Sequence, residues 1–371
     1  MSGSQTPDFT QNKVYETLSQ RARDNKRPSR AQPLGTVAEV RYPGASNREE
    51  MVEGILAQDR DLIAGHFGTI YYKPVTVCGI ELKLEPVQPG IGTVVHGLDL
   101  ATDLVNPEMV AFIRSLWLER RVLMFRGQAH MSHQGMLDFA KRFGEVGLPY
   151  GEPGHEPNGA DLNNQIKVPG FPNILVLPSD EKVPNAASSW HADATWQERP
   201  PMGSILMCRQ APPVGGDTCF CDCYAMWEGL PLDVKERVEH LTAVHVGGMA
   251  HQMDGVTPVS VHPVARSHPE TGRTTLYVQQ GFVQRFAEAH QIAPDEEREL
   301  LAVIQAQEGK SEYTCRMKWE DGSIAMWDNR AVLHSASGDF WPHKRVMERL
   351  TILDFDESRR TPFYTPQRPV G

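Results

Sequence analysis

Residues 204–223 read SILMCRQAPPVGGDTCFCDC, two short apolar runs on either side of a turn-forming segment. The runs 204–208 and 218–223 have the length and composition of buried strands, and the proline and glycine between them favour a turn. The same pattern returns at 274–278, 323–327 and 345–353. Many short strands between glycine and proline turns predict a sandwich or barrel and argue against an alternating parallel α/β sheet.

Two helices and two further strands are predicted before this region. Residues 80–86 alternate apolar and polar side chains as a strand does, and residues 122–125 are a short buried strand candidate. Asn106 followed by proline suits the start of a helix, and Ser132 suits the cap of a second one. Further helical stretches lie near 231–242 and 294–307. The expected class is therefore mainly β with flanking helices, an α+β fold.

The composition is that of a globular protein with an acidic excess. The chain has 371 residues, of which 37 are basic and 47 acidic, for a formal net charge of −10. This balance argues against broad binding of nucleic acid, which needs basic faces. The sequence shows no apolar run long enough for a membrane helix, no signal peptide in residues 1–35, and too few cysteines for a disulfide scaffold. We expect a cytoplasmic protein without nucleic-acid or membrane partners.

Polarity and composition divide the chain at about residue 75. Residues 1–75 are expected to form an N-terminal extension, partly helical or irregular, with one helix candidate near 48–57. Residues 76–371 are expected to form the main domain. Within it, residues 146–188 are rich in glycine, proline and asparagine, with one short apolar run at 174–177, and they predict a long, lid-like loop.

Trp190-His-Ala-Asp193 is the first candidate for chemistry. In an extended backbone, residues i and i+2 face the same way, so the imidazole of His191 and the carboxylate of Asp193 can converge on one ion. A second histidine from a distant strand would complete a two-histidine, one-carboxylate site, which leaves three positions of an octahedral Fe(II) open. The motif alone is a weak signal, because it is expected by chance in a chain with 14 histidines.

Two arginines of the predicted last strand, Arg345 and Arg349, would share one face of that strand. Buried arginines need anionic partners, and a guanidinium binds a carboxylate or a sulfonate with two hydrogen bonds. A pair of this kind predicts a site for small anions. The alternative is that nearby acidic side chains, such as Glu348 and Asp354, neutralise the two arginines.

A zinc site is a further alternative, because five histidines follow Cys219, Cys221 and Cys223 along the chain. These histidines are His240, His245, His251, His262 and His268. None of them shows the paired spacing of structural zinc. We therefore expect the three cysteines to be sheet residues, buried or at an interface.

Several motifs in a fixed order give the chain a specific resemblance to a known family. They are Phe125-Arg-Gly, Arg142-Phe-Gly-Glu145, His191-x-Asp193, Gly215-Gly-Asp-Thr218, His262-Pro-Val, His268-Pro-Glu-Thr-Gly272, Gly281-Phe282 and Trp327-Asp-Asn-Arg330. From about residue 80 to the C-terminus, the chain resembles the taurine dioxygenase/TfdA group of Fe(II)- and 2-oxoglutarate-dependent dioxygenases. The resemblance implies a double-stranded β-helix, a cupin-like jelly roll, which agrees with the strand pattern.

The resemblance also implies roles for individual residues. His191, Asp193 and His334 would be the ligands of Fe(II). Arg345 would hold the distal carboxylate of the cosubstrate 2-oxoglutarate, and Thr218 would hydrogen-bond the same group. O₂ is the second implied cosubstrate.

For the primary substrate, the resemblance implies a small anionic organic molecule whose anionic group is received by Arg349. Candidate contacts beside it are His155, Tyr150, Trp196 and Phe282. The three aromatic residues could line an apolar pocket, which would suit a sulfonate, a sulfate ester, or an aryloxy or alkyl acid. Taurine itself is not favoured, because position 187 is alanine where related taurine dioxygenases carry asparagine.

The implied reaction is hydroxylation of a C–H bond with release of succinate and CO₂. If the hydroxylated carbon bears a heteroatom, cleavage of a C–O, C–S or C–N bond follows. Two alternatives stay open: the same cofactor chemistry used for desaturation or cyclisation of a specialised metabolite, and a non-catalytic jelly-roll binding protein. The resemblance also implies a homodimer or homotetramer.

Overall fold

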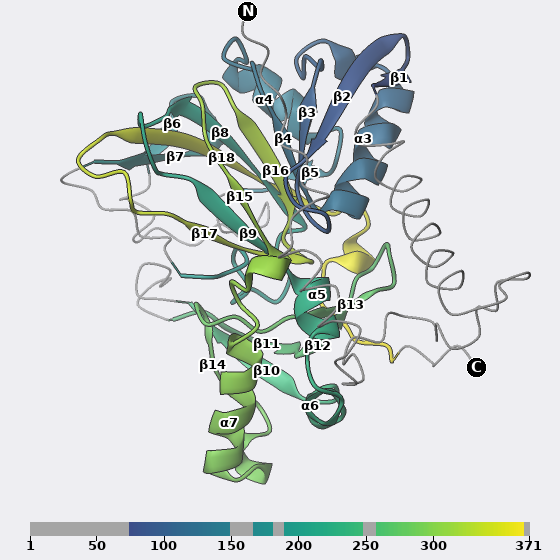
Figure 1. The fold of residues 1–371 in the computed structure, drawn as a ribbon, viewed down its shortest axis with the longest axis vertical. Coiled ribbons are helices and arrows are strands. Elements are labelled where there is room, and N and C mark those ends of the chain that lie inside the picture. Colours follow the sequence, from purple (N-terminus) through teal and green to yellow (C-terminus); the bar gives the residue numbers. More distant parts are fainter. Residues whose placement is uncertain (1–73, 149–165, 181–188, 248–256, 367–371) are drawn as a thin grey trace, which may run out of the picture. The chain divides into compact units, whose positions relative to one another are not determined.

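The computed structural model describes residues 74–148, 166–180, 189–247 and 257–366, all in the larger unit of the chain, Ile63–Gly371 (Figure 1). The predicted N-terminal extension, including its helix candidate, lies outside the described residues except for its last two positions. The first described strand begins at Val75. The boundary at residue 75 stays a prediction.

The largest sheet has ten strands in the order β1-β2-β3-β4-β16-β8-β18-β7-β6, with β5 paired to β18. Its strands are Val75–Val77 (β1), Ile80–Pro86 (β2), Thr93–His96 (β3), Val122–Phe125 (β4), Glu145–Val146 (β5), Ile166–Val168 (β6), Phe171–Ser179 (β7), Gly203–Gln210 (β8), Ile324–Asp328 (β16) and Arg345–Leu353 (β18). Among the described strands, only β3 and β4 pair in parallel. The long strands β8 and β18 lie at the centre, so neighbouring strands shelter their side chains.

A three-stranded sheet, β15-β9-β17, faces these central strands (Figure 1). Its strands are Thr314–Met317 (β15), Thr218–Asp222 (β9) and Val332–Ala336 (β17). Side chains of both sheets meet in one buried cluster, where the rings of Phe220 and Trp327 lie 5.5 Å apart. Two facing antiparallel sheets form a jelly roll, which confirms the predicted fold class.

Two small sheets complete the described strands, β11-β10-β14 and β12-β13. Their strands are Thr242–Val246 (β10), Val259–Pro263 (β11), Ala265–Ser267 (β12), Thr274–Leu276 (β13) and Val283–Phe286 (β14). Their apolar side chains share a second buried cluster with helices α6 (Leu232–Val238) and α7 (Pro294–Gln305).

The other helices are α3 (Pro107–Arg120), α4 (His133–Ala140) and α5 (Cys223–Glu228), and short 3-10 turns lie at Asp103–Val105, Ala289–Gln291, Ser311–Tyr313 and Glu357–Arg359. Both predicted caps are confirmed, because the side chains of Asn106 and Ser132 accept hydrogen bonds from the first turns of α3 and α4. None of the helices in the described ranges has the length and apolar character needed to cross a membrane.

Two sequence-based expectations were wrong in part. Residues 146–188 were expected to be loop, yet the described middle of this stretch is a hairpin, β6 and β7, that extends the main sheet. Residues 149–165 and 181–188 of this stretch lie outside the described residues. Cys223 was expected in a strand beside Cys219 and Cys221, but it begins α5, because the Asp222 side chain caps a helix there.

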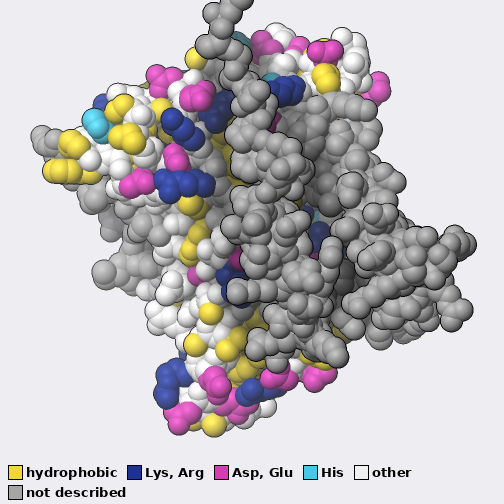
Figure 2. All heavy atoms as spheres, viewed as in Figure 1, with side chains coloured by type: hydrophobic (Ala, Val, Ile, Leu, Met, Phe, Trp, Pro, Cys, Tyr) yellow, Lys and Arg dark blue, Asp and Glu magenta, His cyan; other side chains and the backbone are white. Residues whose placement is uncertain are grey.

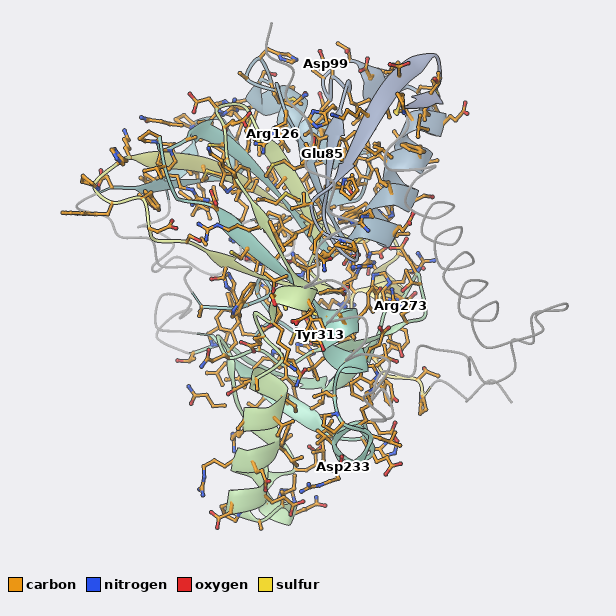
Figure 3. The ribbon with its side chains drawn as sticks, viewed as in Figure 1. Glu85, Asp99, Arg126, Asp233, Arg273 and Tyr313 are labelled. Carbon is orange, nitrogen blue, oxygen red and sulfur yellow. The ribbon has the colours of Figure 1, made fainter. Side chains whose placement is uncertain are left out.

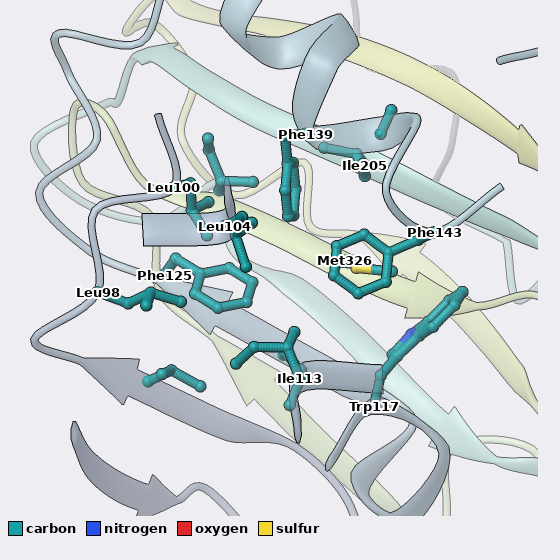
Figure 4. Packing of buried hydrophobic residues seen from close by; sticks show 14 of the residues in the cluster. Leu98, Leu100, Leu104, Ile113, Trp117, Phe125, Phe139, Phe143, Ile205 and Met326 are labelled. Atoms are coloured by element: carbon teal, nitrogen blue, oxygen red, sulfur yellow. The ribbon is translucent and has the colours of Figure 1, made fainter. Parts of the chain in front are cut away.

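Helices α3 and α4 cover the main sheet through an aromatic core (Figure 4). The ring of Phe139 lies edge-on to Phe125, at 6.0 Å between centroids, and to Phe143, at 5.4 Å. Trp117 of α3 closes the group by an edge contact with Phe143 at 6.3 Å. This core also contains Ile205 of β8 and Leu350 of β18, so it packs against the strand that carries Arg345 and Arg349.

Charged side chains are mixed on the described surface. On the face in Figure 2, acidic, basic and scattered apolar side chains alternate, including along α7 at the lower end. Arg273, labelled in Figure 3, forms an exposed ion pair with Glu228. Exposed pairs contribute at most about 1 kcal/mol each to stability. Exposed ion pairs such as this one therefore contribute little to the stability of the fold.

Phe139→Ala should lower the free energy of unfolding by about 3–5 kcal/mol, because it leaves a cavity among the three rings. Urea unfolding followed by tryptophan fluorescence measures the loss. Val105→Ala, at a 70% exposed position, is the control and should change stability by less than about 0.5 kcal/mol. Equal losses in the two variants would contradict this packing.

Candidate active site

The two predicted histidine ligands meet through a backbone bridge between distant segments. His191 N–H donates to the His334 carbonyl at 3.0 Å, and His334 N–H donates to the His191 carbonyl at 2.7 Å. Directly opposed residues of an antiparallel pair carry their side chains on one face. The two imidazole rings consequently lie 4.2 Å apart between centroids. Strand β17 thus supplies the second histidine that the sequence required.

Asp193 completes the group. Ligand atoms of His191, Asp193 and His334 all lie within 4.8 Å of one another, and among the described residues no other set of three such side chains is this close. The chain turns directly after Asp193, where Ala194 has φ 50°, a left-handed conformation that non-glycine residues rarely adopt. Strained backbone of this kind is concentrated at functional sites.

The protonation states suit metal binding. Burial raises the pKa of Asp193, but Arg349 and the two histidines outweigh burial and hold it well below its ordinary value. Burial lowers the pKa of His334 to about 3 and also lowers that of His191. At neutral pH the site therefore offers one ionised carboxylate and two neutral imidazoles.

The donor set fits Fe(II). His191 Nδ1 contacts the Ser189 carbonyl at 2.8 Å, which assigns the proton to Nδ1 and leaves Nε2 as a lone-pair donor. Two imidazole nitrogens and one carboxylate are the facial triad that binds non-haem Fe(II) with open positions for other ligands.

Arg345 is a buried guanidinium at the start of β18. Its Nη2 donates to Thr218 Oγ1 at 3.4 Å, and its buried Nε has no hydrogen-bond partner among the described residues. The indole N–H of Trp319 also donates to Thr218 Oγ1, at 3.0 Å, so the threonine hydroxyl keeps its own proton to donate elsewhere. No described carboxylate forms an ion pair with Arg345. Arg345 and Thr218 therefore present donors to an anion that would come from outside the chain.

Arg349 lies four residues further along the same strand. Its Nη1 donates to Asp193 Oδ1 at 2.8 Å, so the positive charge lies against the candidate metal ligand. Glu348 and Asp354, the acids that could have neutralised the two arginines, have other partners. Glu348 accepts from Arg209 and contacts His133, and Asp354 pairs with Arg330. Neither of these two acids therefore neutralises Arg345 or Arg349 in the described structure, where the acid paired with Arg349 is the buried Asp193.

Of the predicted substrate contacts beside Arg349, the structure describes Trp196 and Phe282. Phe282 lies edge-on to His191, at 5.9 Å between centroids, and edge-on to Trp196, at 4.7 Å. These two side chains form an apolar surface beside His191. Tyr150 and His155 lie outside the described residues, so their roles stay predictions.

Glu308, which the sequence did not single out, helps to hold the segment that carries Phe282. Gly281 N–H donates to the Trp190 carbonyl at 3.2 Å, and Gln280 N–H donates to Glu308 Oε1 at 2.7 Å. Burial raises the pKa of Glu308 to about 7. No local pattern marks Glu308, because its partner lies 28 positions away.

Four of the five histidines considered for zinc are described; His240 is exposed and contacts Glu239, and the other three are buried with structural contacts. His262 Nε2 lies 2.8 Å from the Thr195 carbonyl, and His245 Nδ1 lies 2.9 Å from the Thr195 hydroxyl. His268 contacts Asp328 at 3.0 Å. His262 contacts the backbone and His245 the side chain of Thr195, two residues after Asp193, so both help to position the segment that carries the candidate ligands.

Comparisons with known proteins agree with this geometry. Residues 83–351 match the family described as taurine catabolism dioxygenase TauD, TfdA family. An alpha-ketoglutarate-dependent sulfate ester dioxygenase from Pseudomonas putida is 32% identical over 290 residues, 74% of this chain and 90% of that protein. An alpha-ketoglutarate-dependent 2,4-dichlorophenoxyacetate dioxygenase from Cupriavidus pinatubonensis (strain JMP 134 / LMG 1197) is 31% identical over 293 residues, 74% of this chain and 99% of that protein. The crystal structure of a taurine dioxygenase from Burkholderia xenovorans has a TM-score of 0.62 and 31% identity, with 76% of this chain and 97% of that chain covered.

His191→Ala should abolish high-affinity binding of Mn(II), because the facial site keeps only two of its three ligands. Isothermal titration with Mn(II) measures the affinity, and an unchanged thermal midpoint would show that the fold is intact. His290→Ala removes an exposed histidine and is the control. Equal Mn(II) affinity in the two variants would remove His191 from the site.

Glu308→Gln should change stability in a pH-dependent way. The folded pKa is raised from 4.5 to about 7, so the contribution of Glu308 to stability is present below pH 4.5 and is lost as pH rises through 7. Glutamine stays neutral and keeps the acceptor for Gln280. The variant should be more stable than wild type at pH 8, by roughly 1–3 kcal/mol, and about equal to it at pH 5. A difference in urea unfolding that is the same at both pH values would contradict this assignment.

Proposed function

The chain belongs to the TauD/TfdA family of dioxygenases, and from this membership we propose that it hydroxylates a C–H bond of a small anionic organic substrate in an Fe(II)- and 2-oxoglutarate-dependent reaction. The observation that supports this most directly is the group of His191, Asp193 and His334, with buried Arg349 bonded to Asp193 and buried Arg345 four residues earlier on the same strand. When bound, Fe(II) together with 2-oxoglutarate and O₂ supplies the oxidising power for hydroxylation, with release of succinate and CO₂.

In this proposal, the two neutral histidines and the ionised Asp193 hold the metal. Arg345 binds the distal carboxylate of 2-oxoglutarate, since its guanidinium is buried and has no described acid as a partner. The Thr218 hydroxyl donates its remaining proton to the same carboxylate. A buried cation is stabilised by such an anion, which supports specific binding at this position.

We propose Arg349 as the contact for the anionic group of the primary substrate. Its guanidinium lies against Asp193, so an anion bound there would place the neighbouring carbon close to the metal. Trp196 and Phe282 would shelter the apolar part of the substrate. This chemistry suits a sulfate ester, a sulfonate, or an aryloxy or alkyl acid, and relatives are named for sulfate ester and phenoxy acid substrates. Hydroxylation of a carbon that bears oxygen would be followed by C–O cleavage.

The proposal extends to location and assembly. All six cysteines are described and free, which is consistent with a reducing cytoplasm. The family resemblance favours a homodimer or homotetramer. Gel filtration with light scattering would test the assembly.

Succinate formation tests the function. The purified protein with Fe(II), ascorbate and 2-oxoglutarate should release succinate when it is given members of a panel of alkyl sulfate esters, sulfonates and aryloxy acids. No consumption of 2-oxoglutarate with any of them would favour a non-catalytic binding protein. Product mass separates the outcomes, since hydroxylation adds one oxygen atom and desaturation removes two hydrogen atoms.

Substitution of the two arginines should separate their roles. Arg349→Ala should raise the KM for the primary substrate by roughly 10- to 100-fold, because one charge-assisted contact to its anion is lost, with less effect on 2-oxoglutarate. Arg345→Ala should raise the KM for 2-oxoglutarate by a similar factor, with less effect on the KM for the primary substrate. Steady-state kinetics with each substrate varied in turn measures both constants. Equal effects on the two constants in both variants would contradict separate anion sites.

A further inference from the structure

The two oxygens of the Asp193 carboxylate have different hydrogen-bond partners. Oδ1 accepts from Arg349 Nη1 and lies 3.9 Å from His334 Nε2, so it faces the other ligand atoms of the candidate metal site. Oδ2 accepts a hydrogen bond of 2.6 Å from the Ser204 hydroxyl. The hydrogen bond from Ser204 to Oδ2, at 2.6 Å, is shorter than the bond from Arg349 to Oδ1, at 2.8 Å.

The Ser204 hydroxyl is oriented by two further side chains. Trp327 Nε1 donates to Asn329 Oδ1 at 2.9 Å, and Asn329 Nδ2 donates to Ser204 Oγ at 3.0 Å. An indole N–H can only donate, so it determines which end of the amide faces the serine. The amide N–H then occupies a lone pair of the serine oxygen and leaves the serine proton for Asp193. The donor-only indole of Trp327 therefore sets the direction of every hydrogen bond from Trp327 through Asn329 and Ser204 to Asp193.

The three side chains of this hydrogen-bond chain are all buried. Ser204, Asn329 and Trp327 are each at most 2% exposed. Ser204 of β8 is paired with Trp327 of β16 and with Thr351 of β18, so three adjacent strands determine its position. Buried polar groups cost free energy unless they are paired, and each link here has its partner. A rigid, fully paired chain of this kind can fix a carboxylate in one orientation.

We infer that Ser204 is a positioning residue that engages Oδ2 of Asp193 and so offers only Oδ1 to the metal, with Asn329 and Trp327 setting the direction of its hydrogen bond. The inference rests on the proposed function, because it takes Asp193 as a metal ligand. A carboxylate that binds through both oxygens takes up a coordination position that a cosubstrate needs. Hydrogen bonds to ligands from the surrounding side chains tune metal affinity in general by about 10- to 100-fold.

Co(II) binding to the full-length protein tests this role, because visible d–d absorption reports coordination as well as affinity. Ser204→Ala should weaken Co(II) binding by roughly 10- to 100-fold and change the intensity of the d–d band. Ser323→Ala is the matched control. Ser323 is equally buried, but its hydroxyl bonds Arg126 and the Glu320 backbone. This control should keep the affinity and spectrum of the wild type.

Asn329→Ala tests the direction of the chain. If Asn329 acts through Ser204, the double variant Ser204→Ala/Asn329→Ala should bind Co(II) as Ser204→Ala does, without a further loss. Additive losses overturn the inference. So does a Ser204→Ala variant whose Co(II) affinity and spectrum match those of Ser323→Ala.

Failure of the proposed function is recognisable by a different result. Wild-type protein that binds no Co(II) overturns both the proposed function and the role of Ser204. Tight Co(II) binding without any consumption of 2-oxoglutarate overturns the enzymatic function alone, and the comparison of Ser204→Ala with Ser323→Ala still decides the positioning role.

Discussion

An ionised carboxylate buried in a protein needs compensating charge and hydrogen bonds, and the site depends on how the fold provides them for Asp193. Arg349 and Ser204 each bond one of its oxygens, and the imidazoles of His191 and His334 lie beside it. These groups come from β18, β8, β17 and the segment before β8. The site therefore exists only when both sheets of the jelly roll are packed, which couples folding to the capacity for metal binding.

A second buried network explains motifs that lie away from the candidate metal site. Arg330 bonds Asp328 with two nitrogens, at 2.8 and 2.7 Å, and His268 contacts the same carboxylate. The motif at 327–330 thus divides into alternate residues. Trp327 and Asn329 face Ser204, whereas Asp328 and Arg330 bind the turn that begins at His268. Removing one partner of a buried ion pair generally costs about 3–5 kcal/mol of stability. Asp328 and Arg330 therefore serve the stability of the fold.

Features that depend on local sequence were predictable. The bounds of β18, 345–353, follow from an uninterrupted strand pattern, and the caps at Asn106 and Ser132 follow from local hydrogen bonding. The β6–β7 hairpin was missed, because the glycine, proline and asparagine around the apolar run 174–177 favoured a loop, and β6 at the sheet edge has no apolar run of its own. Ser204 was missed for a different reason: nothing in a buried strand distinguishes a serine that bonds a candidate metal ligand from one that does not.

By itself, the sequence determined the β-rich class, the flanking helices, the paired His191 and Asp193, and the two arginines on one strand, because each of these depends on residues that are neighbours along the chain. Only the tertiary structure decided which carboxylate pairs with Arg349, which hydroxyl holds Asp193, and that Arg345 has no acidic partner among the described residues. Arg349 and Asp193 are 156 positions apart, and their contact depends on strand register and sheet packing. Register is set by the summed pairing of whole strands, so no local motif carries that information.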